Sequence, residues 1–339
     1  MDEPITDLDE IRALMDHLPG PDLAAGSEAT LHQAQLTKPA GALGRLEELA
    51  IWLATWQAQH PPRLDHPRTL VFAGNHGVAA RGVSAYPAAV TAQMVQNFIA
   101  GGAAVNQLCR VFEVGLKVYE MNLDRPTADI VVEPAMSEEE CAKAMAYGMM
   151  AVEPGIDMLA LGERGIGNTT AAAALCGGLF GGDAEMWTGP GTGVAGAAFE
   201  AKRAAVGEAI ARHRPAASDP FDVLRRLGGL ELAAITGAVM AARLGRVPVV
   251  LDGFASTAAA AVLYVADPHA LDHCVVGHVS AEPGHRRLIE RIGQRPLFDF
   301  RMRLGEGSGA TLALAVLKAA AACHNGMATF TQAGVSGPS

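Results

Sequence analysis

Two glutamates stand in glycine-rich turns, where a carboxylate can be held close to a bound ligand. Glu163 belongs to Gly-Glu-Arg-Gly-Ile-Gly-Asn-Thr-Thr at residues 162–170. Glu306 lies between Gly305 and Gly307, which predicts an exposed carboxylate held near the backbone. Such a carboxylate can act as a general base, hold sugar hydroxyls or face a developing positive charge. For Glu306 the alternative is a first-turn glutamate that only interacts with a helix dipole.

The turn around Glu163 has the composition of a phosphate cradle. An apolar, strand-like piece at 159–161 enters it, and the alanine-rich stretch 171–175 that follows favours a helix. Peptide N–H groups at the start of a helix attract anions. The residues that would present donors there, or cap the helix, are Gly165, Gly167, Asn168, Thr169 and Thr170. The same glycines also suit a tight connection that binds nothing, so this alternative stays open.

A second small-residue loop lies at residues 188–193 and contains Gly191, Thr192 and Gly193. Lys202 falls in the helix predicted after it and could reach a phosphate, although a lysine on a helix is more often solvated. Neither a Walker-type lysine spacing nor a G-x-G-x-x-G fingerprint is present. An ordinary NTPase or dinucleotide-binding fold is therefore not favoured.

The composition is typical of a helix-and-sheet enzyme. Of the 339 residues 50% are apolar and 18% are charged, and the net charge is -10. Binding to nucleic acid rests on clustered lysine and arginine, so we expect no nucleic-acid partner. Apolar runs end before they reach membrane-spanning length and no secretory signal is visible, which predicts a cytoplasmic protein with no membrane contact. The five cysteines contain no C-x-x-C pair and are predicted to be core residues.

Strand-like and helical segments alternate along most of the chain. Strands are predicted at 69–73, 115–122, 157–162, 247–251 and 274–277. Helices are predicted at 8–18, 24–36, 43–56, 90–111 with an interruption at Gly101-Gly102, 137–150 with a capping box at Ser137 and Glu140, and 311–322. The alternation predicts a Rossmann-like α/β fold, in which a parallel sheet carries helices on both faces and binds ligands at the carboxyl ends of its strands.

Several motifs together resemble the nicotinate-nucleotide:dimethylbenzimidazole phosphoribosyltransferase family. They are the 162–170 turn, Asp-Gly-Phe at 252–254, Ser-Ala-Glu-Pro-Gly-His at 280–285 and Arg-Leu-Gly-Glu-Gly-Ser-Gly-Ala at 303–310. Thr-Lys-Pro at 37–39 with Gly-Arg-Leu-Glu at 44–47, and Gly-Asn-His-Gly at 74–77 with Ser-Ala-Tyr-Pro at 84–87, resemble the earlier motifs of the family. All of them occur in the order that the family shows.

The resemblance implies a large α/β catalytic domain at residues 65–300 and a small helical domain made from residues 1–64 and 301–339, assembled as a homodimer. It also implies transfer of phosphoribose from nicotinate mononucleotide to dimethylbenzimidazole in the synthesis of the lower ligand of cobalamin. The products would be α-ribazole phosphate and nicotinate. No cofactor is implied.

The resemblance also implies roles for the candidate residues. Glu306 would be the general base, and Glu163 would lie with the 165–170 turn beside the ribose phosphate. Lys202 and the loop from Gly191 to Gly193 would lie nearby. The residues that would border the base are Ser84, Gln93 and Leu304.

The residues suit this chemistry. The nicotinate ring is attached as a pyridinium and leaves without being protonated, so one base is enough, and it removes the N–H proton of the incoming benzimidazole. No pyrophosphate has to be neutralised, so no metal is required. His76, His278 and His285 fall in different loops, which disfavours a metal site built from them.

Two positions and two alternative functions remain open. Pro190 stands where the loop of the family often carries an arginine, so one hydrogen-bond donor to the phosphate is absent or is supplied by Lys202. Arg164 either contributes positive charge to the phosphate cradle or points to solvent. The transferase could use another azole, purine or phenolic acceptor. Alternatively, the protein could bind nucleotides or cobamide precursors without catalysis. The presence of Glu306 between two glycines argues against this alternative.

Overall fold

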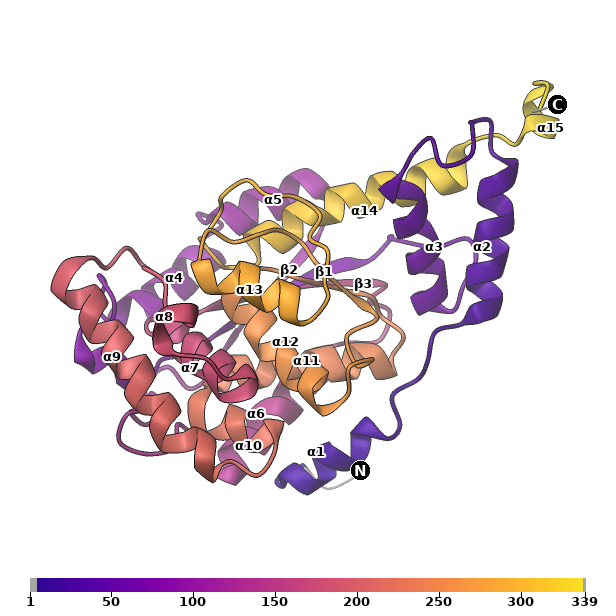
Figure 1. Ribbon diagram of the computed structural model, residues 1–339. Helices are drawn as coiled ribbons and strands as arrows, with labels where there is room; N and C mark the ends of the chain where they lie inside the picture. Colours follow the sequence, from indigo (N-terminus) through magenta and orange to yellow (C-terminus); the bar gives the residue numbers. More distant parts are fainter. Residues whose placement is uncertain (1–4, 338–339) are drawn as a thin grey trace.

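Five parallel strands form the central sheet of the computed structural model, which describes residues 5–337 (Figure 1). They are β1 (Pro67–Ala73), β2 (Gly115–Glu120), β3 (Met158–Arg164), β4 (Val249–Leu251) and β5 (Cys274–Val276). Their order is β2-β1-β3-β4-β5, so the chain adds β2 on one side of β1 and then β3 on the other. Such a reversal opens a crevice at the carboxyl ends of the strands, where open α/β sheets bind ligands.

Helices precede, connect and follow the strands. They are α1 (Leu8–Met15), α2 (Leu23–Gln35), α3 (Arg45–Gln57), α4 (Ala89–Ile99), α5 (Ala104–Phe112), α6 (Glu138–Met150), α7 (Asn168–Phe180), α8 (Ala184–Trp187), α9 (Gly196–His213), α10 (Pro220–Leu227), α11 (Leu230–Leu244), α12 (Phe254–Ala266), α13 (Pro283–Arg291), α14 (Ser308–Gly326) and α15 (Phe330–Ala333), with short 3-10 helices at Gly77–Arg81 and Arg214–Ala216. In the described part of the chain, no helix combines the length and the apolarity that crossing a membrane requires.

Local signals in the sequence set several of these boundaries. The capping box of α6 is confirmed, since the Glu140 N–H donates to Ser137 Oγ at 3.1 Å and the Ser137 N–H donates to the Glu140 carboxylate at 2.9 Å. The segment predicted at 90–111 forms two helices, α4 and α5. They are separated at Gly101, whose φ of 79° lies in the left-handed region that glycine adopts readily.

The sheet has helices on both faces, as predicted (Figure 1). Successive strand residues point to opposite faces. Leu159 and Leu161 therefore join the core made with α7, α11 and α12. Ala160 and Val71 join a second core made with α3, α5 and α14. Both faces of β1 and β3 are buried, which explains why these strands read as continuous apolar runs.

The N-terminal helices pack in two different places (Figure 1). Helices α2 and α3 lie against each other and α3 packs on α14, while Leu36 pairs with Thr329 near α15. Helix α1 instead packs against α6, on the other side of the molecule. The division into domains at residues 64 and 301 stays a prediction. Helix α1 packs on α6, one of the helices that flank the sheet, and not on α2 and α3.

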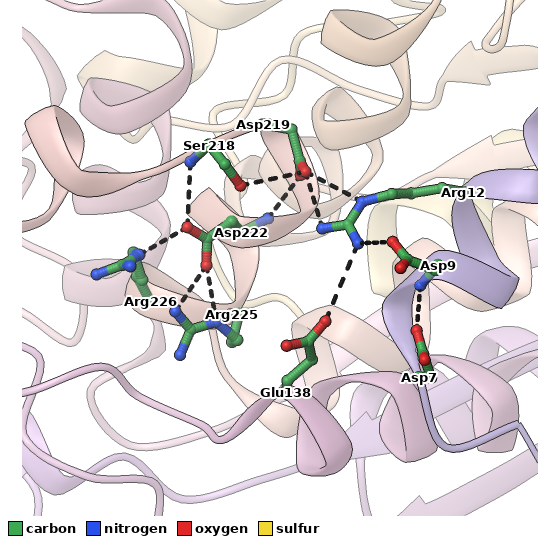
Figure 2. A network of polar contacts seen from close by, with 9 residues as sticks. All are labelled: Asp7, Asp9, Arg12, Glu138, Ser218, Asp219, Asp222, Arg225 and Arg226. Carbon is green, nitrogen blue, oxygen red and sulfur yellow. Dashed lines mark hydrogen bonds and ion pairs between the residues drawn. The ribbon is translucent and has the colours of Figure 1, made fainter.

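Polar contacts, which Figure 2 shows, and buried apolar side chains hold α1 in place. Arg12 Nη2 lies 2.8 Å from Asp219 Oδ2 at the start of α10, and Arg12 Nη1 lies 4.0 Å from Glu138 Oε1 on α6. Partly exposed ion pairs of this kind contribute about 0–1 kcal/mol each. Leu8 and Ile11 are almost fully buried and supply the larger share of the attachment through the hydrophobic effect.

Candidate active site

A cleft of about 510 Å³ lies at the carboxyl ends of β3 and β4. The predicted site residues that line it are Glu163, Gly165, Asn168, Thr169, Gly191, Thr192 and Leu304. A second cavity of about 800 Å³ lies between α6 and the loop at 121–137. Among the described residues that line this larger cavity, none is a predicted site residue, so volume alone does not identify the site. The smaller cleft is the candidate active site.

Glu306 is positioned by its backbone. Its φ is 65°, and Gly305 and Gly307 flank it at 76° and 73°. A non-glycine residue in this region carries strain of about 1–3 kcal/mol, which its surroundings must offset. The Glu306 N–H donates to the Glu163 carbonyl at 3.0 Å, and Arg164 Nη1 donates to Glu306 Oε1 at 3.3 Å. Glu306 is only 1% exposed, so the predicted exposed carboxylate is wrong, because these neighbours cover it.

The two glycine turns pack directly against each other. A β-carbon on Gly162 would overlap the backbone of Gly307, so only glycine allows this approach. Asp252, at the end of β4, accepts the N–H groups of Gly307 at 3.2 Å and Ala310 at 2.8 Å. A carboxylate in this position stabilises the start of α14. The arrangement brings both glutamates to the same edge of the sheet.

Burial dominates the titration of both glutamates. It raises the pKa of Glu163 to about 8, and the negative charges of Asp252 and Glu231 add to the effect. Burial also raises the pKa of Glu306. Arg164 opposes the rise in both pKa values because its positive charge favours the carboxylate form. Burial therefore favours the protonated form of Glu163.

Lys202 is a buried residue of the site and not a surface lysine. It is 0% exposed, and its Nζ donates to Thr169 Oγ1 at 2.8 Å. Burial lowers the pKa of Lys202 to about 8, and the negative charge of Glu282 opposes that fall. A β-carbon on Gly191 would lie 2.6 Å from Lys202 Nζ. Glycine at this position therefore lets the ammonium group approach the loop closely.

Two charged residues of the cleft were assigned no role from the sequence. Glu282 Oε1 accepts the Gly191 N–H at 2.9 Å, and Arg303 Nη1 donates to the Gly191 carbonyl at 2.8 Å. Both side chains therefore fix the loop that Lys202 approaches. The only signal for them in the sequence is that each falls within a motif, Glu282 in 280–285 and Arg303 in 303–310.

The turn after β3 is held differently from its prediction. Gly167, with a φ of 96°, occupies the N-cap position of α7 in place of Asn168, Thr169 or Thr170. Asn168 Nδ2 donates instead to the Glu163 carboxylate. Thr170 is fully buried and does not line the cleft. The start of α7 therefore has no side-chain cap that would compete with a ligand.

The residues predicted to border the base lie at different distances from the cleft. Leu304 lines it. Ser84 lies 2.9 Å, Oγ to Oγ1, from Thr192, which lines it too. Gln93 is exposed on α4 and does not line the cleft. Gly193, which was predicted to contact the phosphoribose, directly follows the lining residue Thr192 but does not line the cleft either. Their roles stay predictions.

The three histidines of the sequence motifs do not meet at one point, although the ring centroids of His278 and His285 lie 6.3 Å apart. His278 Nε2 lies 3.6 Å from Asp252 Oδ1, and His285 Nε2 lies 3.0 Å from Thr257 Oγ1. His76 pairs with a glutamate on α11. Between residues 5 and 337, no three histidine, cysteine, aspartate or glutamate side chains gather in a way that could hold a metal ion.

The fold and the site define an α/β enzyme with a glycine-rich turn beside two buried carboxyl groups, and a phosphoribosyltransferase family model matches residues 18–335. A nicotinate-nucleotide–dimethylbenzimidazole phosphoribosyltransferase of Sinorhizobium medicae is 59% identical over 97% of both chains. One of Brucella anthropi is 56% identical, also over 97% of both. The crystal structure of CobT from Thermus thermophilus has a TM-score of 0.87 at 42% identity, covering 93% of this chain and 100% of that one.

The chain belongs to the nicotinate-nucleotide–dimethylbenzimidazole phosphoribosyltransferase family. The resemblance of the sequence motifs to this family is thereby confirmed, and so is the α/β fold with its parallel sheet.

Proposed function

We propose that this chain transfers phosphoribose from nicotinate mononucleotide to 5,6-dimethylbenzimidazole, which yields α-ribazole 5'-phosphate and nicotinate. The observation that carries the proposal is a buried glutamate next to the cleft that contains the glycine-rich turn after β3. Glu306 does not line the cleft itself, but its neighbour Gly305 and its partner Arg164 do, as does Thr169. This transfer requires a base close to a phosphate seat.

The donor needs no acid. The bond between the sugar carbon and the pyridinium nitrogen breaks, and its electron pair returns to the ring, which leaves with a neutral pyridine nitrogen. The sugar carbon acquires positive charge as in glycoside cleavage. In this proposal Glu163 faces this carbon or holds the ribose hydroxyls, and the positive charge of the sugar carbon favours its ionised form despite the pKa of about 8 that burial imposes.

The acceptor needs one base. One nitrogen of the benzimidazole forms the new bond to the sugar carbon, and the proton on the other nitrogen passes to the Glu306 carboxylate. Burial raises the pKa of Glu306, which strengthens it as a base, while Arg164 favours its ionised form. General-base catalysis of this kind contributes about 10²–10⁴-fold in rate.

The phosphate would bind at the start of α7. The N–H groups of its first turn are free of side-chain caps in the described structure. Lys202 and Arg303 bring positive charge to the neighbouring loop at Gly191. They supply the cationic donors in a loop that carries Pro190 rather than an arginine.

The test is nicotinate release from the mononucleotide, measured with and without dimethylbenzimidazole. We expect release that depends on the acceptor. Release that is equally fast without it would indicate a hydrolase, and no release at all would leave a binding protein. Competition with adenine and with phenol identifies the acceptor class, and a lack of preference for the benzimidazole would count against the proposed acceptor.

Homodimer assembly and a cytoplasmic location stay predictions. Size-exclusion chromatography with light scattering tests the first, with twice the chain mass of 35.1 kDa as the expected result.

A further inference from the structure

A buried histidine–glutamate pair lies beneath the turn that the proposed function assigns to the substrate phosphate. His76 follows β1, and Glu231 lies in the first turn of α11. His76 Nε2 is 2.6 Å from Glu231 Oε1, and the two residues are 2% and 0% exposed. Neither residue takes part in the reaction steps described above.

The pair touches the glycines on which the turn depends. A β-carbon on Gly74 would lie 2.5 Å from Glu231 Oε2, and one on Gly165 would lie 3.4 Å from Glu231 Oε1 and 2.5 Å from the Gly74 carbonyl. A β-carbon on Gly167 would lie 3.1 Å from His76 Cβ. The end of β1, the turn after β3 and the start of α11 therefore meet around these two side chains.

Each member of the pair depends on the other. Within residues 5–337, His76 Nδ1 and Glu231 Oε2 have no hydrogen-bond partner. A buried hydrogen-bonded pair adds little net stability compared with apolar side chains of the same shape. Removing one member, however, leaves the other buried and unpaired. Stability alone therefore does not account for the pair, whereas a fixed position of the turn does.

We propose that His76 and Glu231 are positioning residues, whose hydrogen bond holds the Gly165–Gly167 turn and the start of α7 at the place where the substrate phosphate binds. The proposal rests on the proposed function. The charge of Glu231 has a second effect, since it adds to the rise in the pKa of Glu163. The pair thus acts on both the geometry and the charge of the donor site.

The first test compares His76→Ala with His76→Gln. A displaced phosphate seat weakens donor binding, so we expect His76→Ala to raise the KM for nicotinate mononucleotide about tenfold or more while the KM for dimethylbenzimidazole stays within about twofold. His76→Gln keeps an N–H donor near the position of Nε2 and should restore most of the loss. A loss of folded protein would instead lower turnover per total enzyme and leave both KM values unchanged.

The second test uses Glu231→Gln, which keeps an acceptor for His76 and removes the charge. Glu231→Gln also tests the proposal if His76→Ala fails to fold. We expect the KM for the mononucleotide to stay near that of the wild type, and its pH dependence to move to lower pH because the pKa of Glu163 falls. An unchanged pH profile would overturn the electrostatic part of the proposal.

His213→Ala is the matched control. His213 is also 2% exposed, its Nε2 lies 2.8 Å from the Ile130 carbonyl, and, among the described residues, its Nδ1 finds no partner. This variant should lose thermal stability without a change in either KM. If His76→Ala behaves in the same way, or raises both KM values alike, the positioning role is wrong.

Wild-type turnover separates a failure of this proposal from a failure of the proposed function. If the wild type releases no nicotinate, the proposed function fails. The pair is then tested by calorimetry with inorganic phosphate, which His76→Ala must bind more weakly than His213→Ala does. Equal phosphate affinities in the two variants would overturn the proposal.

Discussion

The two ends of the cleft differ in burial and in charge. At the phosphate end Lys202 is 0% exposed and Glu282 is 4% exposed. Lys202 bonds to Thr169 at the start of α7, and Glu282 bonds to the loop at Gly191. At the acceptor end Tyr86 is 54% exposed and Leu304 is 49% exposed. A site built from buried polar partners rejects a ligand that leaves them unpaired, whereas an apolar slot discriminates weakly. The molecule should therefore be strict about its donor and tolerant about its acceptor.

The largest effect is expected at Glu306, the proposed base, which lies next to the cleft-lining residues Arg164 and Gly305. Glu306→Gln keeps the shape and the contact with Arg164 but cannot take up a proton. Turnover should fall about 100-fold or more, while binding of nicotinate mononucleotide stays intact. Steady-state kinetics and calorimetry measure the two quantities. Glu200→Gln, an exposed glutamate on α9, is the control and should leave both unchanged, and an unchanged rate in Glu306→Gln would remove the base from the mechanism.

Lys202→Met tests the strictness of the phosphate end. The variant fills similar volume without the charge, and a charged hydrogen bond contributes about 1.5–3 kcal/mol, so the KM for the mononucleotide should rise about 10-fold to 100-fold. The KM for dimethylbenzimidazole should not change. Lys143→Met, on the exposed face of α6, is the control. Equal increases in both KM values would show that the two ends are not independent.

The pH dependence of donor binding gives a smaller and reversible change at the same end. Burial lowers the pKa of Lys202 to about 8, so the ammonium group loses its proton as the pH rises through that value. Glu163, with a pKa of about 8, becomes negative in the same range. The loss of the Lys202 charge weakens binding of a phosphate dianion, by at most about tenfold per pH unit above that pKa, whereas the negative charge of Glu163 faces the positively charged ring and sugar of the donor. Calorimetry between about pH 7 and 9.5 measures this loss, which Lys202→Met should reduce, and a constant affinity would contradict it.

The smallest effect is expected at the acceptor end. Leu304→Ala removes apolar contact from a half-exposed side chain, so the KM for dimethylbenzimidazole should rise only about threefold to tenfold. Binding of nicotinate mononucleotide should stay unchanged, and the ratio of kcat/KM for dimethylbenzimidazole to that for adenine should decrease. Leu31→Ala, at an exposed position on α2, is the control. A loss of donor binding in Leu304→Ala would contradict the separation of the two ends.

Much of the fold follows from local signals. The strands at β1 and β3 are buried on both faces and therefore read as apolar runs, and Ser137 with Glu140 marks the start of α6. The glycines of the 162–170 turn mark a connection in which the backbone must approach other groups closely. These features depend on neighbours in the sequence, so pattern and propensity are sufficient to find them.

The environment of the charged groups does not follow from such signals. Lys202 has the spacing of an ordinary helix lysine, and Glu306 has that of an exposed turn residue, yet both are buried. Glu231 and His76 are 155 residues apart and meet only because β1 and α11 pack together. Helix α1 shows the same limit, since nothing local in its sequence predicts that it packs on α6 and not on α2.

By itself the sequence determined the strands, several of the helices, the glycine turns and the motifs of the family, because each is encoded over a few adjacent residues. Only the tertiary structure decided which carboxyl groups share a cleft, which cation is buried with them and how far their pKa values move. Burial and Coulomb interactions depend on distances between segments remote in the chain, and those distances exist only once the sheet has brought its loops to one edge.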